Sequence, residues 1–458
     1  MRENKMGTMP VGRLLLNMAL PMIASMLVQA LYNIVDSIYI SRVSESAVTA
    51  LSLAFPVQNM SIALSSGVAV GVNSLLSRSL GEKNQKMANR AAGNGIFLIL
   101  WGVAIFILFG IFGARPFFAA QSQVQETVDG GTAYVSIVCI FCLGSFMQVL
   151  LERLLQSTGR TIYSMITQAT GAIINIILDP IMIFGLLGMP RMGIAGAAIA
   201  TVIGQWTAAL LALYFNVRKN PDIQFSLQDI KPAGGAIRQI MIVGIPSMIM
   251  MAIGSVMNFG MNQILQGFSE TATGVFGIYY KLQSFIFMPV FGLNGATISI
   301  VAYNYGARRP ERMLKAVRLA CIAALCIMSV GFLAFQFAPD VLLGIFNPSP
   351  AFLEIGERAL RTISIHFPIA ALCIVIGGVF QALGNGIYST IVSLFRQLIV
   401  LLPSAYLLSL TGNVNNVWWA FIIAEAVSGS VTLFFFIRIY RQRIRPLSDN
   451  GTESHEQE

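Results

Sequence analysis

The chain has 458 residues, of which 56% are hydrophobic and only 11% are charged, against about 25% charged residues in an ordinary soluble domain. A soluble protein of this length has no core large enough for that much apolar surface, so the composition excludes a soluble globular protein and indicates an all-α integral membrane protein. The net charge of +9 is then explained by basic loops that face a lipid bilayer, and we expect no nucleic-acid partner.

Apolar runs of about 20 residues, separated by polar or charged segments, predict twelve transmembrane helices. In chain order the runs fall at 14–40, 48–77, 91–113, 132–157, 161–187, 193–217, 238–266, 272–302, 316–338, 362–383, 386–410 and 414–438. The first run continues past Leu31 without a small-residue cleavage site, so we expect a first spanning helix there and not a cleaved signal.

The loops differ in their content of Lys and Arg. Most of these residues lie at the two termini and in the loops that share their side of the membrane. The opposite loops contain only Arg42, Arg115, Arg191, Arg358 and Arg361. Because positive loops stay in the cytoplasm, we predict a multi-pass protein of the cell membrane with cytoplasmic N- and C-termini.

The second half of the chain repeats the first with a shift of 225 positions. Pro21 then falls on Pro246 and Gly67 on Gly292, and "QSTGRTIYS" (156–164) falls on "QALGNGIYS" (381–389). A register shared by separated sites indicates a duplication, with two six-helix repeats that enter the membrane from the same side.

The duplication predicts an N-lobe and a C-lobe around a central cavity, the architecture of alternating-access transporters. We place the N-lobe at 1–217, a cytoplasmic linker at 218–237, the C-lobe at 238–440 and a cytoplasmic tail at 441–458. The sequence has no Gly-rich P-loop motif, and its only two histidines are too few for a metal- or histidine-based active site, so we expect no enzyme.

Two predicted N-lobe helices carry acids within apolar runs, which is costly in a membrane and points to function. The polar side chains that share a helix face are Gln29, Asn33 and Asp36 on the first helix and Asn175 and Asp179 on the fifth, and Thr201 of the sixth helix adds a hydroxyl. Such oxygens suit Na⁺ as a ligand, and a close carboxylate pair also suits a shared proton.

Prolines accompany both acids. Pro180 follows Asp179 directly, and Pro21 precedes Asp36 on the first helix. Because proline removes a backbone donor, we expect Pro180 to bend its helix or open it locally, and Pro21 to act likewise.

The C-lobe has a different set of charges within its spans: Lys281, Arg396 and Glu425. One interpretation is a buried ion-paired cluster that fixes three helices, and the other is that Glu425 forms a second cation or substrate site. His366 is expected at the membrane interface, and the CxxC of Cys139 and Cys142, which lies within an apolar run, is expected to be structural.

Several strings resemble the multidrug and toxic compound extrusion (MATE) family. They are "LYNIVDSIYISRV", "ALSLAFPVQ", "LQSTGRTIYSMI", "NIILDPIMIFGLLGMPRMGIAGAAIAT" and "GIYYKLQSFIFMPVFGLNGA", and the similarity extends over about residues 8 to 440. The resemblance implies twelve helices in two lobes, a V-shaped central cavity, and efflux of organic cations coupled to inward flow of H⁺ or Na⁺.

The resemblance also implies roles for individual residues. It makes Asp36, Asn175, Asp179 and Thr201 the cation or proton site and Pro21 the helix-bending residue. Some members carry acids on the seventh and tenth helices, whereas this chain has Asn258, Asn262 and His366 there, so a C-lobe cation site of that type is not expected. The expected substrate-binding residues are Gln29, Tyr32, Asn33, Asn258, Asn262 and Tyr279.

The sequence therefore predicts a secondary active antiporter that exports organic cations or drug-like compounds by alternating access, as a monomer and without a bound cofactor. We favour H⁺ as the coupling ion because two close carboxylates share a proton readily, while Na⁺ needs about five or six oxygens. The alternative is a flippase for lipid-linked oligosaccharides, for which Lys281 and Arg396 are the only cationic candidates.

Overall fold

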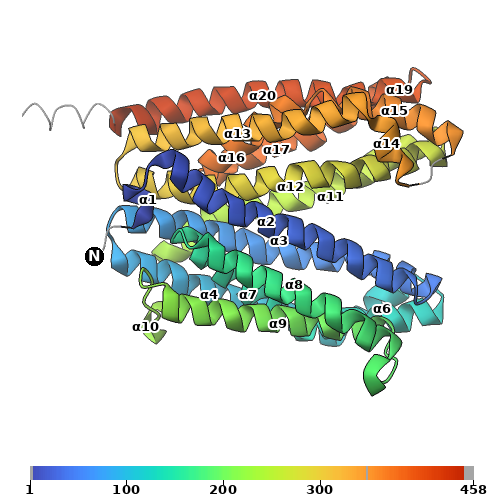
Figure 1. The fold of residues 1–458 in the computed structure, drawn as a ribbon, viewed down its shortest axis with the longest axis horizontal. Helices are drawn as coiled ribbons and strands as arrows, with labels where there is room; N and C mark the ends of the chain where they lie inside the picture. Colours follow the sequence, from blue (N-terminus) through green and yellow to red (C-terminus); the bar gives the residue numbers. More distant parts are fainter. Residues whose placement is uncertain (1–3, 347–348, 448–458) are drawn as a thin grey trace, which may run out of the picture. The chain divides into compact units, whose positions relative to one another are not determined.

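The computed structural model describes residues 4–346 and 349–447, and the secondary structure of these residues is helical throughout (Figure 1). Two compact units divide the chain. Unit 1 contains Asn4 and Ala24–Met248, and unit 2 contains Lys5–Ile23 with the described residues from Ile249 on.

Unit 1 is built from the following segments: the second part of α2 (Val11–Ser41), α3 (Glu45–Gly81), α4 (Gln85–Leu108), η1 (Phe109–Gly113), α5 (Ala114–Ala119), α6 (Gln125–Ile140), α7 (Leu143–Ser157), α8 (Thr161–Phe184), η2 (Leu186–Gly188), α9 (Ile194–Lys219), α10 (Leu227–Ile230) and the first part of α11 (Gly234–Gln266).

Unit 2 is built from these: α1 (Lys5–Thr8), the first part of α2, the second part of α11, α12 (Glu270–Gly306), α13 (Pro310–Phe337), α14 (Pro339–Gly344), α15 (Pro350–Ser364), α16 (Phe367–Ala382), α17 (Gly386–Leu394), η3 (Phe395–Ile399), α18 (Leu401–Ser409), α19 (Val414–Val417), α20 (Trp419–Ile439) and η4 (Tyr440–Ile444).

The predicted number of spans agrees with these helices. Within the described residues, ten helical segments are long and apolar enough to cross a membrane, and two bent helix pairs bring the number to twelve. Together with the solved structures described below, they confirm the predicted class, an all-α protein with twelve spans in two halves. The last span continues to Leu447, beyond the predicted end at 438, and the rest of the predicted tail lies outside the described residues.

The two bent pairs occupy equivalent positions of the repeat. Helices α6 and α7 meet at an angle of 48°, and α15 and α16 meet at 49°. The two breaks, at Phe141–Cys142 and at Ile365–His366, lie within one residue of each other in the 225-residue register. Ser44 and Ser269, also 225 apart, cap α3 and α12 by accepting the backbone N–H three residues on, at 3.1 Å. The duplication therefore extends to helix breaks and caps.

Proline does not interrupt the helices that carry the candidate acids. Helix α8 continues through Pro180 to Phe184, and α2 continues through Pro21. Neither helix ends at its proline, and the expected bend or local opening at Pro180 and Pro21 stays a prediction.

Glycines let the first parts of α2 and α11 pack closely within the unit that each joins. In unit 1, a Cβ atom on Gly67 of α3 would lie 2.9 Å from the carbonyl oxygen of Gly244 on α11. At the matching position in unit 2, a Cβ atom on Gly292 of α12 would lie 2.8 Å from the backbone nitrogen of Ile23 on α2. Small residues at such crossings allow close backbone packing, as is common in membrane proteins.

The predicted linker is anchored to unit 1. Asn94 of α4 donates from Nδ2 to the Asp229 carbonyl at 3.1 Å, and its Oδ1 accepts from the Ala233 backbone at 2.8 Å. Gly93 leaves room for the same α10 backbone. This segment is therefore held against α4 by specific contacts.

Large apolar side chains cover much of the outer surface of both units. Examples are Phe112, Leu187, Val330 and Phe337, which are 69% to 87% exposed. A soluble protein rarely leaves so much apolar surface in water, so these side chains are suited to contact lipid.

Candidate functional site

The buried polar group of unit 1 begins on α8. Asn175 and Asp179 lie one turn apart on one face of this helix, and they are 2% and 0% exposed. Helix α9 runs beside α8 (Figure 1) and brings Thr201 to the same place. The Asn175 amide nitrogen donates to Asp179 Oδ1 at 3.3 Å and to Thr201 Oγ1 at 3.2 Å. One amide thus positions both a carboxylate and a hydroxyl.

Helix α2 supplies the second carboxylate. Asp36 lies within hydrogen-bonding reach of Asp179, and Tyr32, one turn earlier on α2, lies within reach of Thr201. Two carboxyl groups can form a hydrogen bond with each other only when one of them carries a proton. The structure therefore brings together Asp36, Asn175, Asp179 and Thr201, the four residues that the sequence predicts for a cation or proton site.

Three oxygens of this group lack a hydrogen-bond partner in the described part of the chain. They are Asp36 Oδ1, Asn175 Oδ1 and Asp179 Oδ2, and all three are buried. The ion pairs among the described residues give neither acid a basic partner. Buried acceptors without donors are unfavourable, so the group is suited to bind a proton or a small cation.

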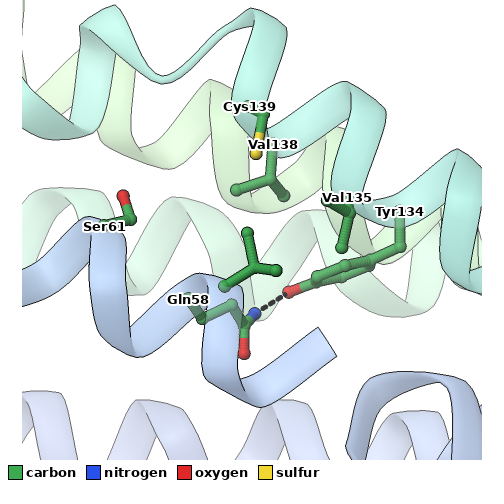
Figure 2. A pocket seen from close by; sticks show the side chains of 7 residues that line it. Gln58, Ser61, Tyr134, Val135, Val138 and Cys139 are labelled. Atoms are coloured by element: carbon green, nitrogen blue, oxygen red, sulfur yellow. Dashed lines mark hydrogen bonds between the residues drawn. The ribbon is translucent and has the colours of Figure 1, made fainter. Parts of the chain in front are cut away.

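Tyr134 and Gln58 are neighbours of this group that the sequence analysis did not select as site residues. Gln58 donates from Nε2 to the Tyr134 hydroxyl at 2.7 Å, and Figure 2 shows this pair on α3 and α6 beside a small pocket. Tyr134 lies close enough to interact electrostatically with Asp36 and Asp179. Gln58 falls on Gln283 in the repeat register, whereas no sequence signal singles out Tyr134.

The predicted substrate-binding residues are dispersed. Gln29 accepts from Gln168 Nε2 at 2.9 Å, which ties α2 to α8 within unit 1. Asn33 and Asn262 are exposed, and Asn258 donates to the Gly254 carbonyl of its own helix at 3.1 Å. Tyr32 belongs to the carboxylate group described above. Their assignment to the substrate remains a prediction.

Unit 2 contains a different arrangement from the expected charged cluster. Glu425 of α20 is buried, and its Oε2 lies 3.8 Å from His366 Nδ1. Lys281 is exposed, and in the described residues neither Lys281 nor Arg396 forms an ion pair with Glu425. The expected cluster of Lys281, Arg396 and Glu425 is therefore not assembled as one set of ion pairs.

His366 corrects a second expectation. We predicted an interfacial position, but the residue is only 5% exposed. The bend between α15 and α16 turns it into the interior of unit 2, where the Tyr279 hydroxyl lies 3.4 Å from Nε2. Tyr279 itself is fully buried. A sequence-based boundary for a long span did not reveal this break.

These features define a class of protein: a polytopic, two-fold repeated helical membrane protein with a buried acidic group in one half. A family model described as MatE matches residues 21–181 and again residues 246–407. The two matches begin 225 residues apart, which confirms the predicted internal repeat. The chain belongs to the MatE family, the MATE transporters that the sequence strings resemble, and it is a transporter and not an enzyme.

Curated relatives extend over nearly the whole chain. A multidrug export protein MepA of Staphylococcus haemolyticus is 24% identical over 448 residues, which cover 96% of each chain. An FAD transporter of Shewanella oneidensis is 26% identical over 433 residues, which cover 94% of this chain and 95% of the relative.

Solved structures agree with the fold. A crystal structure of MATE in complex with MaL6 superposes with a TM-score of 0.89 at 26% identity, and it covers 98% of this chain and 100% of that one. An outward-facing MATE transporter of the MOP superfamily gives the same TM-score at 25% identity, with 98% and 99% coverage.

Proposed function

We propose that the protein is a secondary active antiporter that exports organic cations or drug-like compounds from the cytoplasm in exchange for protons. The observation that carries this proposal is the pair of half-buried Asp36 and buried Asp179, which lie within hydrogen-bonding reach of each other and have no basic partner in the described residues. The names of the multidrug export relatives support the class of substrate.

The charge of the pair provides the coupling. With one proton bound, the pair shares it in a carboxyl–carboxylate hydrogen bond, and with two protons it is neutral. When protons leave, the two carboxylates repel each other, and their negative charge attracts a cationic substrate. Proton and substrate then favour different states of the transporter, and this difference in affinity is what couples their movements.

Na⁺ is the alternative coupling ion. The unpartnered oxygens of Asp36, Asn175 and Asp179, with Thr201 Oγ1, offer four oxygen ligands, fewer than the five or six that we expect Na⁺ to need. The closeness of the two carboxyl groups favours the proton, because they can share it in a hydrogen bond, whereas a bound Na⁺ would need both groups in their ionised form.

The test uses purified protein in proteoliposomes loaded with a fluorescent organic cation such as ethidium. An imposed pH gradient in Na⁺-free buffer should drive ethidium transport, whereas an inward Na⁺ gradient at equal pH should not. Transport driven only by the Na⁺ gradient would overturn the proton assignment and leave the antiport proposal standing. Absence of transport under both gradients would overturn antiport of this cation.

The same assay tests the acids. Asp36→Asn and Asp179→Asn should each lower gradient-driven ethidium transport at least about 100-fold, because a pair with only one carboxyl group no longer changes its charge in the same way. Asp129→Asn is the matched control, since Asp129 is an exposed acid of the same unit that accepts only from Gln125 at 3.0 Å. Transport by either site variant at the rate of the Asp129→Asn protein would contradict the proposed site.

A second cargo class follows from the Shewanella relative, which is named an FAD transporter. A flavin dinucleotide is an anion, and the unit 1 group offers it carboxylates and no basic side chain among the described residues, so we place it second. Uptake of FAD but not ethidium by the proteoliposomes would reverse this order. The flippase alternative gains no support from Lys281 and Arg396, which form no joint site with Glu425.

A further inference from the structure

A second group of titratable side chains lies inside unit 2, on three different helices. The Tyr279 hydroxyl of α12 lies 3.4 Å from His366 Nε2, and His366 Nδ1 lies 3.8 Å from Glu425 Oε2 of α20. All three residues are buried, with 0%, 5% and 3% exposure. The three side chains form a continuous series from phenol to imidazole to carboxylate.

The rings around His366 keep this series away from water. Phe421 stacks on the imidazole with a centroid distance of 6.0 Å and an interplanar angle of 16°. Phe367 and Phe287 meet it with centroid distances of 5.2 Å and 6.3 Å. Apolar side chains would fill this environment at a lower cost than an imidazole and a carboxylate. Ionisable residues within membrane spans usually have a function, so we interpret the buried acid beside the histidine in that way.

The contacts define where a proton can reside. The Tyr279 hydroxyl and His366 Nε2 share a hydrogen bond in which either atom can be the donor, depending on the tautomer. The other ring nitrogen, Nδ1, is the one that faces Glu425. Nδ1 has no hydrogen-bond partner among the described residues, and the 3.8 Å separation from Glu425 is beyond hydrogen-bond length. One added proton, on Oε2 of Glu425 or on the imidazole, forms a single O–H or N–H bond and changes the charge of the pair by one.

The other groups around His366 and Glu425 do not prevent this change of charge. Glu425 Oε1 accepts from Ser428 at 3.3 Å, and the Cys373 thiol of α16 lies within reach of the Glu425 carboxyl group. Thr432 donates to the Cys373 sulfur at 3.7 Å. Arg396 of η3 interacts with both members electrostatically, but it forms no ion pair with Glu425 in the described chain. The carboxylate is thus not held permanently by a cation in contact with it.

His366 and Glu425 lie at a place in the fold where a change in their charge can affect the packing of helices. His366 stands at the break between α15 and α16, at the start of α16. The equivalent break of unit 1 has Phe141 in the matching position, and Phe141 cannot titrate. The two halves share the bend, but only the second half has an imidazole in it.

We propose that Tyr279, His366 and Glu425 form a proton-binding site in unit 2, in addition to the acidic group of unit 1. It binds one proton between the imidazole and the carboxylate, and the bound proton alters the contact between the α15–α16 bend and α20. This inference goes beyond the proposed antiport and does not depend on it, because proton binding is measurable without substrate or gradient.

The composition of the chain permits a direct measurement. His366 and His455 are its only histidines, so the His455→Gln protein has a single imidazole. Histidine labelled with ¹³C and ¹⁵N is incorporated into the full chain, and the imidazole signals are followed by NMR from about pH 5 to about pH 9, the range in which histidine ordinarily titrates. The His455→Gln protein is compared with three further variants on that background: Glu425→Gln, Tyr279→Phe and, as the matched acid-to-amide control, Glu152→Gln.

We expect the imidazole signals of the parent protein to follow the binding of one proton within this range. Glu425→Gln should change the proton affinity at least about tenfold, a shift of one pH unit, and Tyr279→Phe should change the Nε2 signal in particular. Glu152 is buried in unit 1, where it accepts from Thr167 at 3.1 Å. The Glu152→Gln substitution should therefore leave the titration curve of the imidazole unchanged.

Two results would overturn the site. One is an imidazole that does not respond to pH anywhere in this range in the parent protein. The other is a set of curves in which Glu425→Gln and the Glu152→Gln control coincide. If the Glu425→Gln protein does not fold, the Tyr279→Phe protein provides the test. Imidazole signals unchanged from those of the parent protein would contradict a site that includes Tyr279, His366 and Glu425. None of these results bears on transport driven through Asp36 and Asp179.

Discussion

A single amide organises the acidic group of unit 1. Asn175 donates to Asp179 and to Thr201 from the same nitrogen, so the hydroxyl on α9 holds the amide that in turn holds the carboxyl group. Thr201 also binds Tyr32 of α2. A hydroxyl on a third helix therefore fixes the geometry of an acid that it does not itself touch.

Removing that hydroxyl tests its role. Thr201→Val preserves the shape of the side chain but cannot accept from Asn175, and a hydrogen bond of this kind contributes about 0.5–1.5 kcal/mol. We expect gradient-driven ethidium transport to fall about threefold to tenfold with little change in folded yield. The matched control is Thr207→Val on the same helix, whose hydroxyl donates only to the Ile203 carbonyl. Equal rates for the two variants would show that Thr201 does not position the site.

Between helices, backbone packing depends on a few small residues. Gly71 of α3 faces the Ile240 carbonyl of α11 so closely that a Cβ atom would collide with the backbone. This contact and the one at Gly67 lie on one side of α3, four residues apart, and they attach the first part of α11 to unit 1. A flexible side chain could move aside, but a helix backbone cannot do so without separating the two helices.

Alanine at this contact should destabilise the protein. Gly71→Ala overfills the contact, which typically costs about 1–3 kcal/mol, and we expect a lower midpoint of thermal unfolding in detergent. Gly377→Ala is the control, because no atom lies within 4 Å of its Cβ position. Alanine is the better helix former, so the control should unfold at the same temperature as the parent protein or higher. An unchanged midpoint for Gly71→Ala would contradict the close contact.

Across the whole molecule, duplication explains why equivalent features recur in both halves. The family model matches twice in the same register, and the helix breaks, serine caps and close-packed glycines follow that register too. An even number of spans in each half returns the chain to the side from which it started. The basic loops then predict which side that is.

The orientation is testable by labelling. In a cysteine-free background, single cysteines replace Gln121 and Lys86, both of which are exposed. A membrane-impermeant thiol reagent applied to intact cells should modify position 121 alone, and position 86 should react only after the cells are permeabilised. Modification of position 86 in intact cells would place the termini outside the cytoplasm.

The sequence by itself determined the membrane class, the twelve spans, the duplication and the acidic group. Burying a carboxylate in lipid is so unfavourable that acids such as Asp36 and Asp179 stand out wherever they occur in an apolar run. Helical periodicity alone then places Asn175 and Asp179 on one face of their helix, because residues four apart are one turn apart.

Tertiary structure decided which of the remaining groups meet. Hydropathy identifies a long span but not a break within it, so His366 was expected at the membrane interface, and only the 49° bend between α15 and α16 brings it to Glu425. The same applies to Tyr134, which the packing of α6 brings close enough to interact electrostatically with the acids of unit 1. Contacts between residues far apart in the chain depend on how helix surfaces fit together, and a one-dimensional pattern of polarity does not contain that information.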